Sequence, residues 1–172
     1  MQANGNIEIK SCDEALLPQA RALIEEYTRR LGRDLTFQHL DEELDDIAAK
    51  YTPPNGELLV AVDGNTVLGM VAYHRHTGKR CEMKRLYVVP SARGRNLGER
   101  LVSAIIQHAS DAGYTEMVLD TITPLQVAIA LYKKHGFEEC APYYDNPMAD
   151  VVYMRLELHK EITSRRNGFS AM

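Results

Sequence analysis

The sequence predicts a single α/β domain, and three observations predict it. Runs with the two-residue alternation of strands are interleaved with apolar stripes at helical period. One strand-like run ends in a glycine-bearing turn that leads directly into a helix. The chain has 172 residues, 45% of them apolar and 26% charged, which is ordinary for one globular domain. We expect residues 1–172 to form that domain and residues 160–172, which show no periodicity, to be a loose tail.

The N-terminal third predicts one strand followed by two helices. Residues Ile7–Ser11 alternate apolar and polar positions, as a short strand does. Apolar positions at helical spacing predict a helix over residues 18–31, which Gly32 ends. A second stripe of this kind runs over residues 37–51 and stops at Pro53-Pro54.

The middle of the chain predicts a hairpin and a third strand. Residues 58–62 and 66–74 are rich in strand-forming residues, and Asp63-Gly64-Asn65 joins them. This linker favours a tight hairpin, because both Gly and Asn tolerate positive φ. A further strand-like run covers residues 80–89 and ends at a proline.

The last part of the chain alternates between helices and strands. Apolar stripes predict amphipathic helices over residues 97–112 and 124–135. Strand-like runs cover residues 117–121, 137–141 and 151–158. The order of the elements therefore has the alternation of an α/β fold.

Composition excludes several classes of protein. No apolar run reaches the roughly 18 residues of a membrane span, and the N-terminus lacks the features of a signal peptide. We therefore expect a cytoplasmic protein with no membrane partner. A net charge of −4 disfavours nucleic acid as a partner. Three cysteines without a CxxC pair predict neither a disulfide framework nor a metal site.

The turn after residues 80–89 has the features of an anion site. The unpaired N–H groups of a first helical turn, together with the positive end of the helix dipole, attract a phosphate. Gly94 and Gly98 allow a ligand to approach closely, and Arg93 and Arg95 add positive charge. Neither the dinucleotide pattern GxGxxG nor the P-loop pattern GxxxxGK[ST] is present.

Two segments resemble the GNAT superfamily of N-acetyltransferases. Arg93-Gly94-Arg95-Asn96-Leu97-Gly98 resembles its acetyl-CoA motif [QR]-x-x-G-x-[GA], with Asn96 in place of the usual middle glycine. We expect the turn to be kept, since Asn tolerates left-handed conformations; Asn96 and Glu99 also fit a capping box. The segment from Ala128 to Phe137 looks like the signature A-x-x-L-Y-x-x-x-G-F, although Leu125 replaces an asparagine that often precedes it.

The resemblance implies a fold and a place for the cofactor. It implies a central mixed, mostly antiparallel sheet flanked by four helices, and splayed where the parallel strands at residues 80–89 and 117–121 part to admit acetyl-CoA. By this resemblance, the residues that bind the cofactor are Leu86, Tyr87, Val88, Arg93, Gly94, Arg95, Asn96, Leu97, Gly98 and Lys133.

The resemblance also implies a reaction, in which the acetyl group of acetyl-CoA passes to a primary amine by direct attack in a ternary complex. Glu82 is the expected general base that takes the amine proton, and Tyr132 the expected general acid for the thiolate. Each has a structural alternative. Glu82 could pair with a neighbouring cation such as Lys84, and Tyr132 could be a core aromatic.

The acceptor is an amine that the sequence does not identify. A small-molecule amine is the main expectation, with a protein lysine or N-terminus as the alternative, and a homodimer is left open. The acidic run over residues 41–46 is either a solvated helix face or the border of a groove for a cationic acceptor. The rival function is a non-catalytic acyl-CoA-binding sensor, which the departures at Asn96 and Leu125 would suit.

Overall fold

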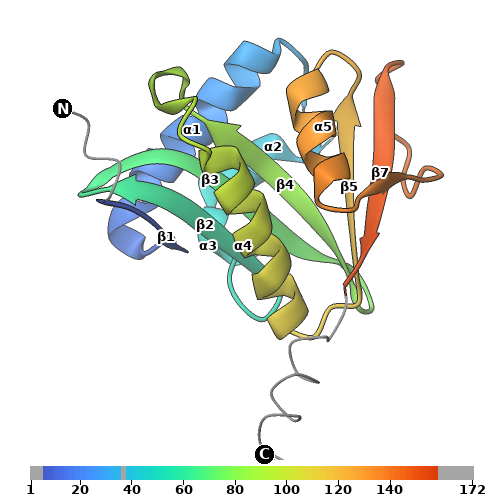
Figure 1. Ribbon diagram of the computed structural model, residues 1–172, viewed down its shortest axis with the longest axis horizontal. Helices are drawn as coiled ribbons and strands as arrows, with labels where there is room; N and C mark the ends of the chain where they lie inside the picture. The colour runs from blue at the N-terminus through green and yellow to red at the C-terminus, as the bar shows by residue number, and fades with distance from the viewer. Residues whose placement is uncertain (1–5, 36–37, 159–172) are drawn as a thin grey trace, which may run out of the picture.

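The computed structural model describes residues 6–35 and 38–158 and shows a central sheet with helices on both faces (Figure 1). The strands follow the order β1-β2-β3-β4-β5-β7-β6. Among the described strands only β4 and β5 pair in parallel, so the expected mixed, mostly antiparallel sheet is confirmed. The strands are β1 (Ile7–Ser11), β2 (Gly56–Asp63), β3 (Thr66–Thr77), β4 (Arg80–Val88), β5 (Glu116–Ile122), β6 (Glu138–Glu139) and β7 (Val151–Glu157).

The helices agree with the sequence except for the second one. The described helices are α1 (Leu17–Leu31), α2 (Leu40–Asp45), α3 (Ile47–Lys50), α4 (Leu97–Asp111) and α5 (Gln126–Lys134). One helix was expected over residues 37–51, but Asp46 leaves the helical region at φ −149° and ψ 80°. Its side chain accepts a hydrogen bond of 3.1 Å from the N–H of Ala49 and starts α3 instead. No helix in these ranges is long and apolar enough to cross a membrane.

The strand expected near residue 140 is shorter than predicted, and two expected segments lie outside the described residues. The strand expected over residues 137–141 is reduced to β6, Glu138–Glu139. The last hydrogen bond of this segment to β7 runs from the N–H of Cys140 to the carbonyl of Tyr153 at 2.8 Å, and the chain leaves β7 beyond it. Phe37 and the expected tail over residues 160–172 lie outside the described residues.

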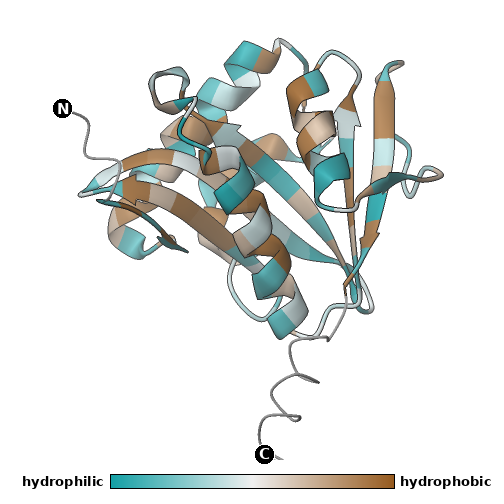
Figure 2. Ribbon diagram, viewed as in Figure 1, coloured by the Kyte–Doolittle hydropathy of each residue, from teal (hydrophilic) through white to brown (hydrophobic). Residues whose placement is uncertain are grey.

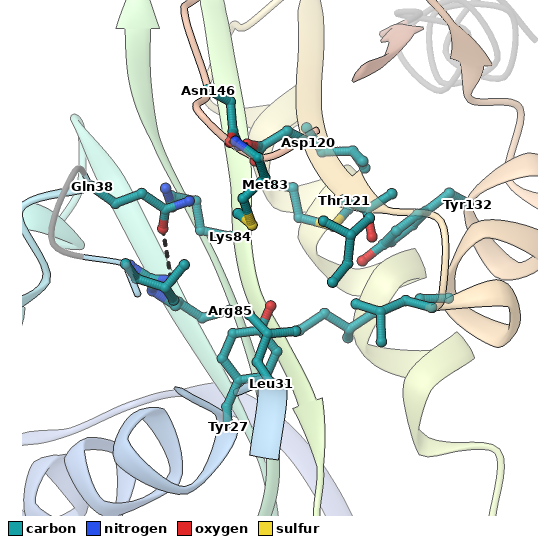
Figure 3. Close-up of a pocket in the computed structure, with 17 residues that line it drawn as sticks. Tyr27, Leu31, Gln38, Met83, Lys84, Arg85, Asp120, Thr121, Tyr132 and Asn146 are labelled. Atoms are coloured by element: carbon teal, nitrogen blue, oxygen red, sulfur yellow. Dashed lines mark hydrogen bonds between the residues drawn. The ribbon is translucent and has the colours of Figure 1, made fainter. Parts of the chain in front are cut away.

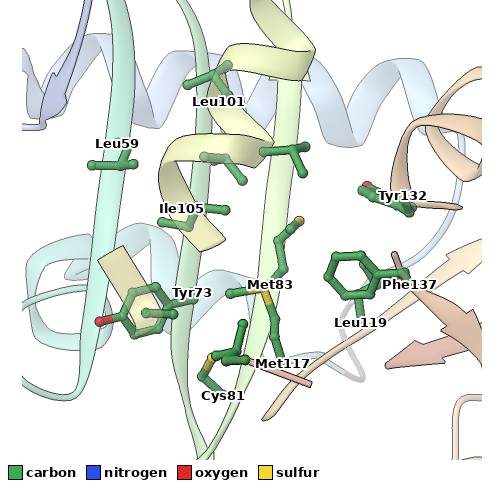
Figure 4. Close-up of a cluster of buried hydrophobic side chains, with 14 of the residues drawn as sticks. Leu59, Tyr73, Cys81, Met83, Leu101, Ile105, Met117, Leu119, Tyr132 and Phe137 are labelled. Carbon is green, nitrogen blue, oxygen red and sulfur yellow. The ribbon is translucent and has the colours of Figure 1, made fainter. Parts of the chain in front are cut away.

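Each face of the sheet has its own hydrophobic core. On one face α4 packs across the central strands, with Leu101 and Ile105 against Leu59 and Met83 (Figure 4). On the other face α1 buries Ile24 against β3 and β4. Apolar residues gather where α4 lies over the strands (Figure 2). The central strands are therefore covered on both faces and form a rigid frame.

β4 contains a bulge that divides the sheet. Its pairing with β3 passes from Ala72↔Lys84 to Met70↔Tyr87, so β4 carries one extra residue there. Within the bulge, Arg85 has a φ of 63°, a left-handed conformation that is rare for this residue type. β4 pairs with β5 only over Arg80–Glu82, and the two strands part beyond that point. The expected splayed sheet is present, and the bulge begins at Arg85, three residues after the pairing with β5 ends at Glu82.

A buried ion pair holds the bulge to α2. Arg85 Nε donates to Glu43 Oε2 at 2.8 Å, and Arg85 Nη2 donates to Oε1 at 3.0 Å. Lys50 donates to the same carboxylate at 2.9 Å. Burial alone raises the pKa of Glu43, but the hydrogen bonds and charges of Arg85 and Lys50 outweigh it and lower this pKa to about 2. The strained residue is therefore fixed by two parallel charged hydrogen bonds.

This pair can be tested by removing one of its charges. Glu43→Gln leaves the buried Arg85 guanidinium without its counter-charge, and we expect the free energy of unfolding to fall by about 3–5 kcal/mol. The matched control is Glu42→Gln, whose side chain is 78% exposed, and its effect should stay within about 0.5 kcal/mol. Urea denaturation measures both values. Equal losses in the two variants would show that the buried pair does not hold the fold.

Candidate active site

A groove of about 1030 Å³ opens where β4 and β5 part. Its walls come from the end of β4, the turn into α4, the end of α1 and one face of α5. The expected cofactor-binding residues on its wall are Leu86, Tyr87, Val88, Arg93, Gly94, Asn96, Leu97 and Gly98. The remaining two, Arg95 and Lys133, do not line it, whereas Lys134 does.

The turn into α4 has the backbone shape that its sequence predicts. Gly94 has a φ of 86°, and Asn96 has a φ of 63° and a ψ of 22°. The left-handed conformation expected for Asn96 is therefore confirmed. The capping-box alternative is wrong, because no side chain caps α4 and Glu99 instead accepts a hydrogen bond of 2.7 Å from Lys134. Leu97, Gly98 and Glu99 of the first turn of α4 line the groove, and the Asn96 side chain does not occupy the N–H groups of that turn.

Three cations line the groove, Arg30, Arg93 and Lys134, together with the carboxylate of Glu99. The two of interest here are Arg93 and Lys134. Arg93 lies with its guanidinium carbon 6.0 Å from the centre of the Tyr87 ring, and its Nε donates to the carbonyl of Val88 at 3.3 Å. The Lys134 side chain is 63% exposed beside Glu99. Both cations can move toward an anion held by the backbone of the turn, so the residues present suit a pyrophosphate.

A second, smaller cavity of about 80 Å³ adjoins the groove (Figure 3). Five residues line both spaces: Tyr27, Leu31, Leu86, Leu125 and Ala128. The wall of the small cavity holds several polar side chains that do not line the groove, among them those of Gln38, Lys84, Arg85, Asp120, Tyr132 and Asn146. The two spaces are therefore adjacent along these five residues.

Tyr132 lies in the wall of the small cavity. It belongs to α5, is only 8% exposed, and its ring packs edge-on against Phe137 with 5.9 Å between ring centres. Burial raises the pKa of its hydroxyl, so the group stays protonated and can donate a proton or a hydrogen bond.

Glu82 lines neither the groove nor the small cavity, although the next two residues of β4, Met83 and Lys84, line the cavity. One carboxylate oxygen lies 2.7 Å from Nε2 of His74, and the other accepts a hydrogen bond from the hydroxyl of Tyr143. Burial raises the pKa of Glu82, but these bonds and the charge of Lys84 outweigh it and lower the pKa to about 2. The group is an ionised carboxylate, and its low pKa makes it a weak base.

Asp120 is a carboxylate in the cavity wall that sequence reasoning missed. Its Oδ2 accepts a hydrogen bond of 2.6 Å from Asn146 and another from the hydroxyl of Tyr144. Tyr153 donates to the carbonyl of Tyr144 at 2.8 Å and fixes that loop. The available signal was the single charged residue inside the apolar run of β5.

The acidic run before α3 does not border the cavity. Glu43 is engaged by Arg85, Asp46 caps α3, and Asp41, Glu42 and Asp45 are exposed. None of these residues lines either space. The solvated-face interpretation therefore suits all of them except the buried Glu43.

Comparisons with known proteins agree with this geometry. The model of the acetyltransferase (GNAT) family matches residues 20–137. An uncharacterized N-acetyltransferase of Schizosaccharomyces pombe is 51% identical over 146 residues, which cover 84% of this chain and 90% of that protein. A Streptococcus agalactiae acetyltransferase superposes with a TM-score of 0.76 at 22% identity, over 90% of this chain and 99% of that one. A Salmonella typhimurium acetyltransferase solved with its cofactor acetyl-CoA has a TM-score of 0.65 at 19% identity, over 91% of this chain and 96% of that one.

The charge state of Glu82 can be tested through the dependence of stability on pH. Its folded pKa is lower than the ordinary value of 4.5, so its contribution is present above about pH 4.5 and is lost as pH falls toward 2. At pH 7 we expect Glu82→Gln to lower the free energy of unfolding by roughly 3 kcal/mol. Urea titrations between about pH 7 and pH 2 should show this difference shrinking. The exposed Glu8→Gln should show a small, constant difference, and a constant difference for Glu82→Gln would contradict the assignment.

Proposed function

The chain belongs to the GNAT acetyltransferase family, and on that premise we propose that it transfers the acetyl group of acetyl-CoA to a primary amine by direct attack. The observation that carries the proposal is the shared wall between the large groove and the small polar cavity. A thioester in the groove and an amine in the cavity would meet there without a covalent enzyme intermediate. The buried Cys81, whose thiol pKa burial raises to about 12, is not needed as a nucleophile.

The groove suits acetyl-CoA in shape and in chemistry. The N–H groups of the turn over residues 94–98 would hold the pyrophosphate, with Arg93 and Lys134 as the nearby cations. The pantetheine would lie along Leu86–Val88, beyond the point where β4 stops pairing with β5. Arg85 and Leu86 have no partner residue in the pairing with β3. The N–H of Leu86 is therefore a candidate donor to the thioester carbonyl, whose negative charge grows during attack.

Tyr132 is the proposed acid for the leaving thiolate. Its hydroxyl is protonated at neutral pH, and it lies in the wall that faces the groove through Ala128 and Leu125. This position supports catalysis over the sensor alternative, because a sensor needs no proton donor beside the thioester.

Two carboxylates are candidates for the base, and the geometry favours Asp120 over Glu82. Asp120 lines the cavity in which the amine would sit, whereas Glu82 lies behind it with both oxygens bonded. A base must reach the proton that it removes, directly or through one water molecule. We propose that Asp120 attracts the ammonium group and takes its proton, and that Glu82 orients His74 and Tyr143.

Coenzyme A binding tests the groove separately from the chemistry. Coenzyme A should raise the thermal midpoint, by roughly 2.7 kcal/mol of stabilisation at 100 times Kd. Gly98→Val should abolish the rise, since the new side chain would project beside Leu131 into the groove. Ser103→Val, an exposed β-branched substitution on the same helix, should keep it. A rise that survives Gly98→Val would place coenzyme A elsewhere.

The two carboxylates can be ranked by kinetics. Asp120→Asn should lower kcat/KM toward about 10³-fold at pH 7, and the loss should shrink at higher pH as more of the amine becomes neutral. Glu82→Gln should lose less than Asp120→Asn, because its carboxylate does not reach the cavity. Release of free thiol measures the rates, and far-UV circular dichroism checks that both variants fold. The reverse order would return the role of base to Glu82.

A further inference from the structure

Lys84 is a buried cation that makes no hydrogen bond to any residue in the described ranges. Its side chain is only 8% exposed, and it lines the small cavity. The nearest anionic atom is Oε1 of Glu82 at 3.9 Å, which is too far for a hydrogen bond. That oxygen already lies 2.7 Å from His74. A buried ammonium with unused donors is unfavourable unless a ligand completes it.

Within residues 6–35 and 38–158, Lys84 forms no ion pair other than the one with Glu82. Its neighbour across the pairing with β3 is Ala72, whose side chain is too short and apolar to reach the ammonium. Arg85, the next cation along β4, differs because Glu43 neutralises it with two hydrogen bonds. Burial lowers the pKa of Lys84 to about 8, which agrees with incomplete pairing and still leaves the group largely charged at neutral pH.

Asp120 provides the opposite charge in the same wall. Its Oδ2 accepts hydrogen bonds from two neutral donors, Asn146 and Tyr144, and no cation of the described chain forms an ion pair with it. The cavity therefore offers one cation and one anion whose charges are not matched by close partners. A ligand with an anionic group and an amine would complement both.

We propose that the acceptor is an amino acid, or a molecule with the same head group, whose carboxylate binds Lys84 while its amine lies at Asp120. This rests on the proposed function and names the class of its acceptor. The cavity volume of about 80 Å³ is that of two to three water molecules at roughly 30 Å³ each. Such a space suits a small head group, and the remainder of the acceptor lies outside it. Lys84 acts by binding and orientation and takes no part in the proton transfers.

The experiment compares amino acids with the amines that decarboxylation would leave. Phenylalanine is paired with phenethylamine, and methionine with 3-(methylthio)propylamine, each with acetyl-CoA and detection of free thiol. Lys84→Met keeps the length and apolar stem but removes the charge. It should lower kcat/KM about 10- to 100-fold for the amino acids and leave the decarboxylated amines nearly unchanged. The quantity compared is the ratio of kcat/KM for the variant to kcat/KM for the wild type, measured on one acceptor at a time. Differences in amine pKa between acceptors therefore cancel.

Two controls accompany this comparison. Lys79→Met removes an exposed lysine from the turn between β3 and β4 and should change neither class of acceptor. Lys84→Arg keeps a cation and should retain part of the preference for amino acids. The thermal shift of Lys84→Met with coenzyme A reports folding and an intact groove, since Lys84 does not line the groove.

The outcomes separate this inference from the proposed function. If Lys84→Met lowers both members of a pair equally, Lys84 serves the fold or the chemistry and the inference is wrong. If wild-type protein acetylates the decarboxylated amines but not the amino acids, the inference is also wrong while the proposed function stands. If wild-type protein binds coenzyme A but transfers acetyl to no amine of either kind, the proposed function itself fails.

Discussion

The bulge in β4 at Arg85 is the constraint on which the site depends. An arginine in a left-handed conformation is unfavourable by itself, and its two hydrogen bonds to Glu43 hold it in place. The extra residue turns the end of β4 away from β5 after only three paired residues. The resulting gap cannot close, because α1 and α4 fix β4 from both faces. The groove is thus created by a wedge-shaped gap between β4 and β5, which begins after Glu82, and not by a loop on the surface of the sheet.

Burial, hydrogen bonds and neighbouring charges together set the charge of each titratable group around this gap. Tyr132 is kept protonated by desolvation, whereas Glu82 and Glu43 are kept ionised because hydrogen bonds and nearby cations outweigh the same effect. Lys84 lies between these cases: it is buried, its nearest carboxylate oxygen is that of Glu82 at 3.9 Å, and it makes no hydrogen bond to the described residues. Each group therefore has a defined charge before any ligand arrives, and little reorganisation is needed during the reaction.

The sequence predicted features that depend on local chemistry. The first strand has the predicted bounds, and the left-handed turn at Asn96 follows from the tolerance of asparagine for positive φ. Sequence reasoning failed where distant residues decide the outcome. Arginine carries no signal for positive φ, and its partner Glu43 lies 42 positions earlier in the chain. Asp120 gains its place from Tyr144 and Asn146, on a loop that no local pattern connects with β5. Between α2 and α3, the Asp46 side chain caps α3 through its hydrogen bond from the N–H of Ala49. This cap divides the apolar pattern over residues 37–51, which periodicity alone predicts to be one helix.

The central claim is that the wedge opened by the bulge is where coenzyme A binds. The most direct measurement is a titration of the ¹⁵N-labelled 19.4 kDa chain with coenzyme A, observed through its backbone amide resonances. We expect the largest changes at the amides of residues 86–88 and 94–98, all of which except Arg95 line the groove. Changes concentrated on β1 and β2, or on β6 and β7, would contradict the account.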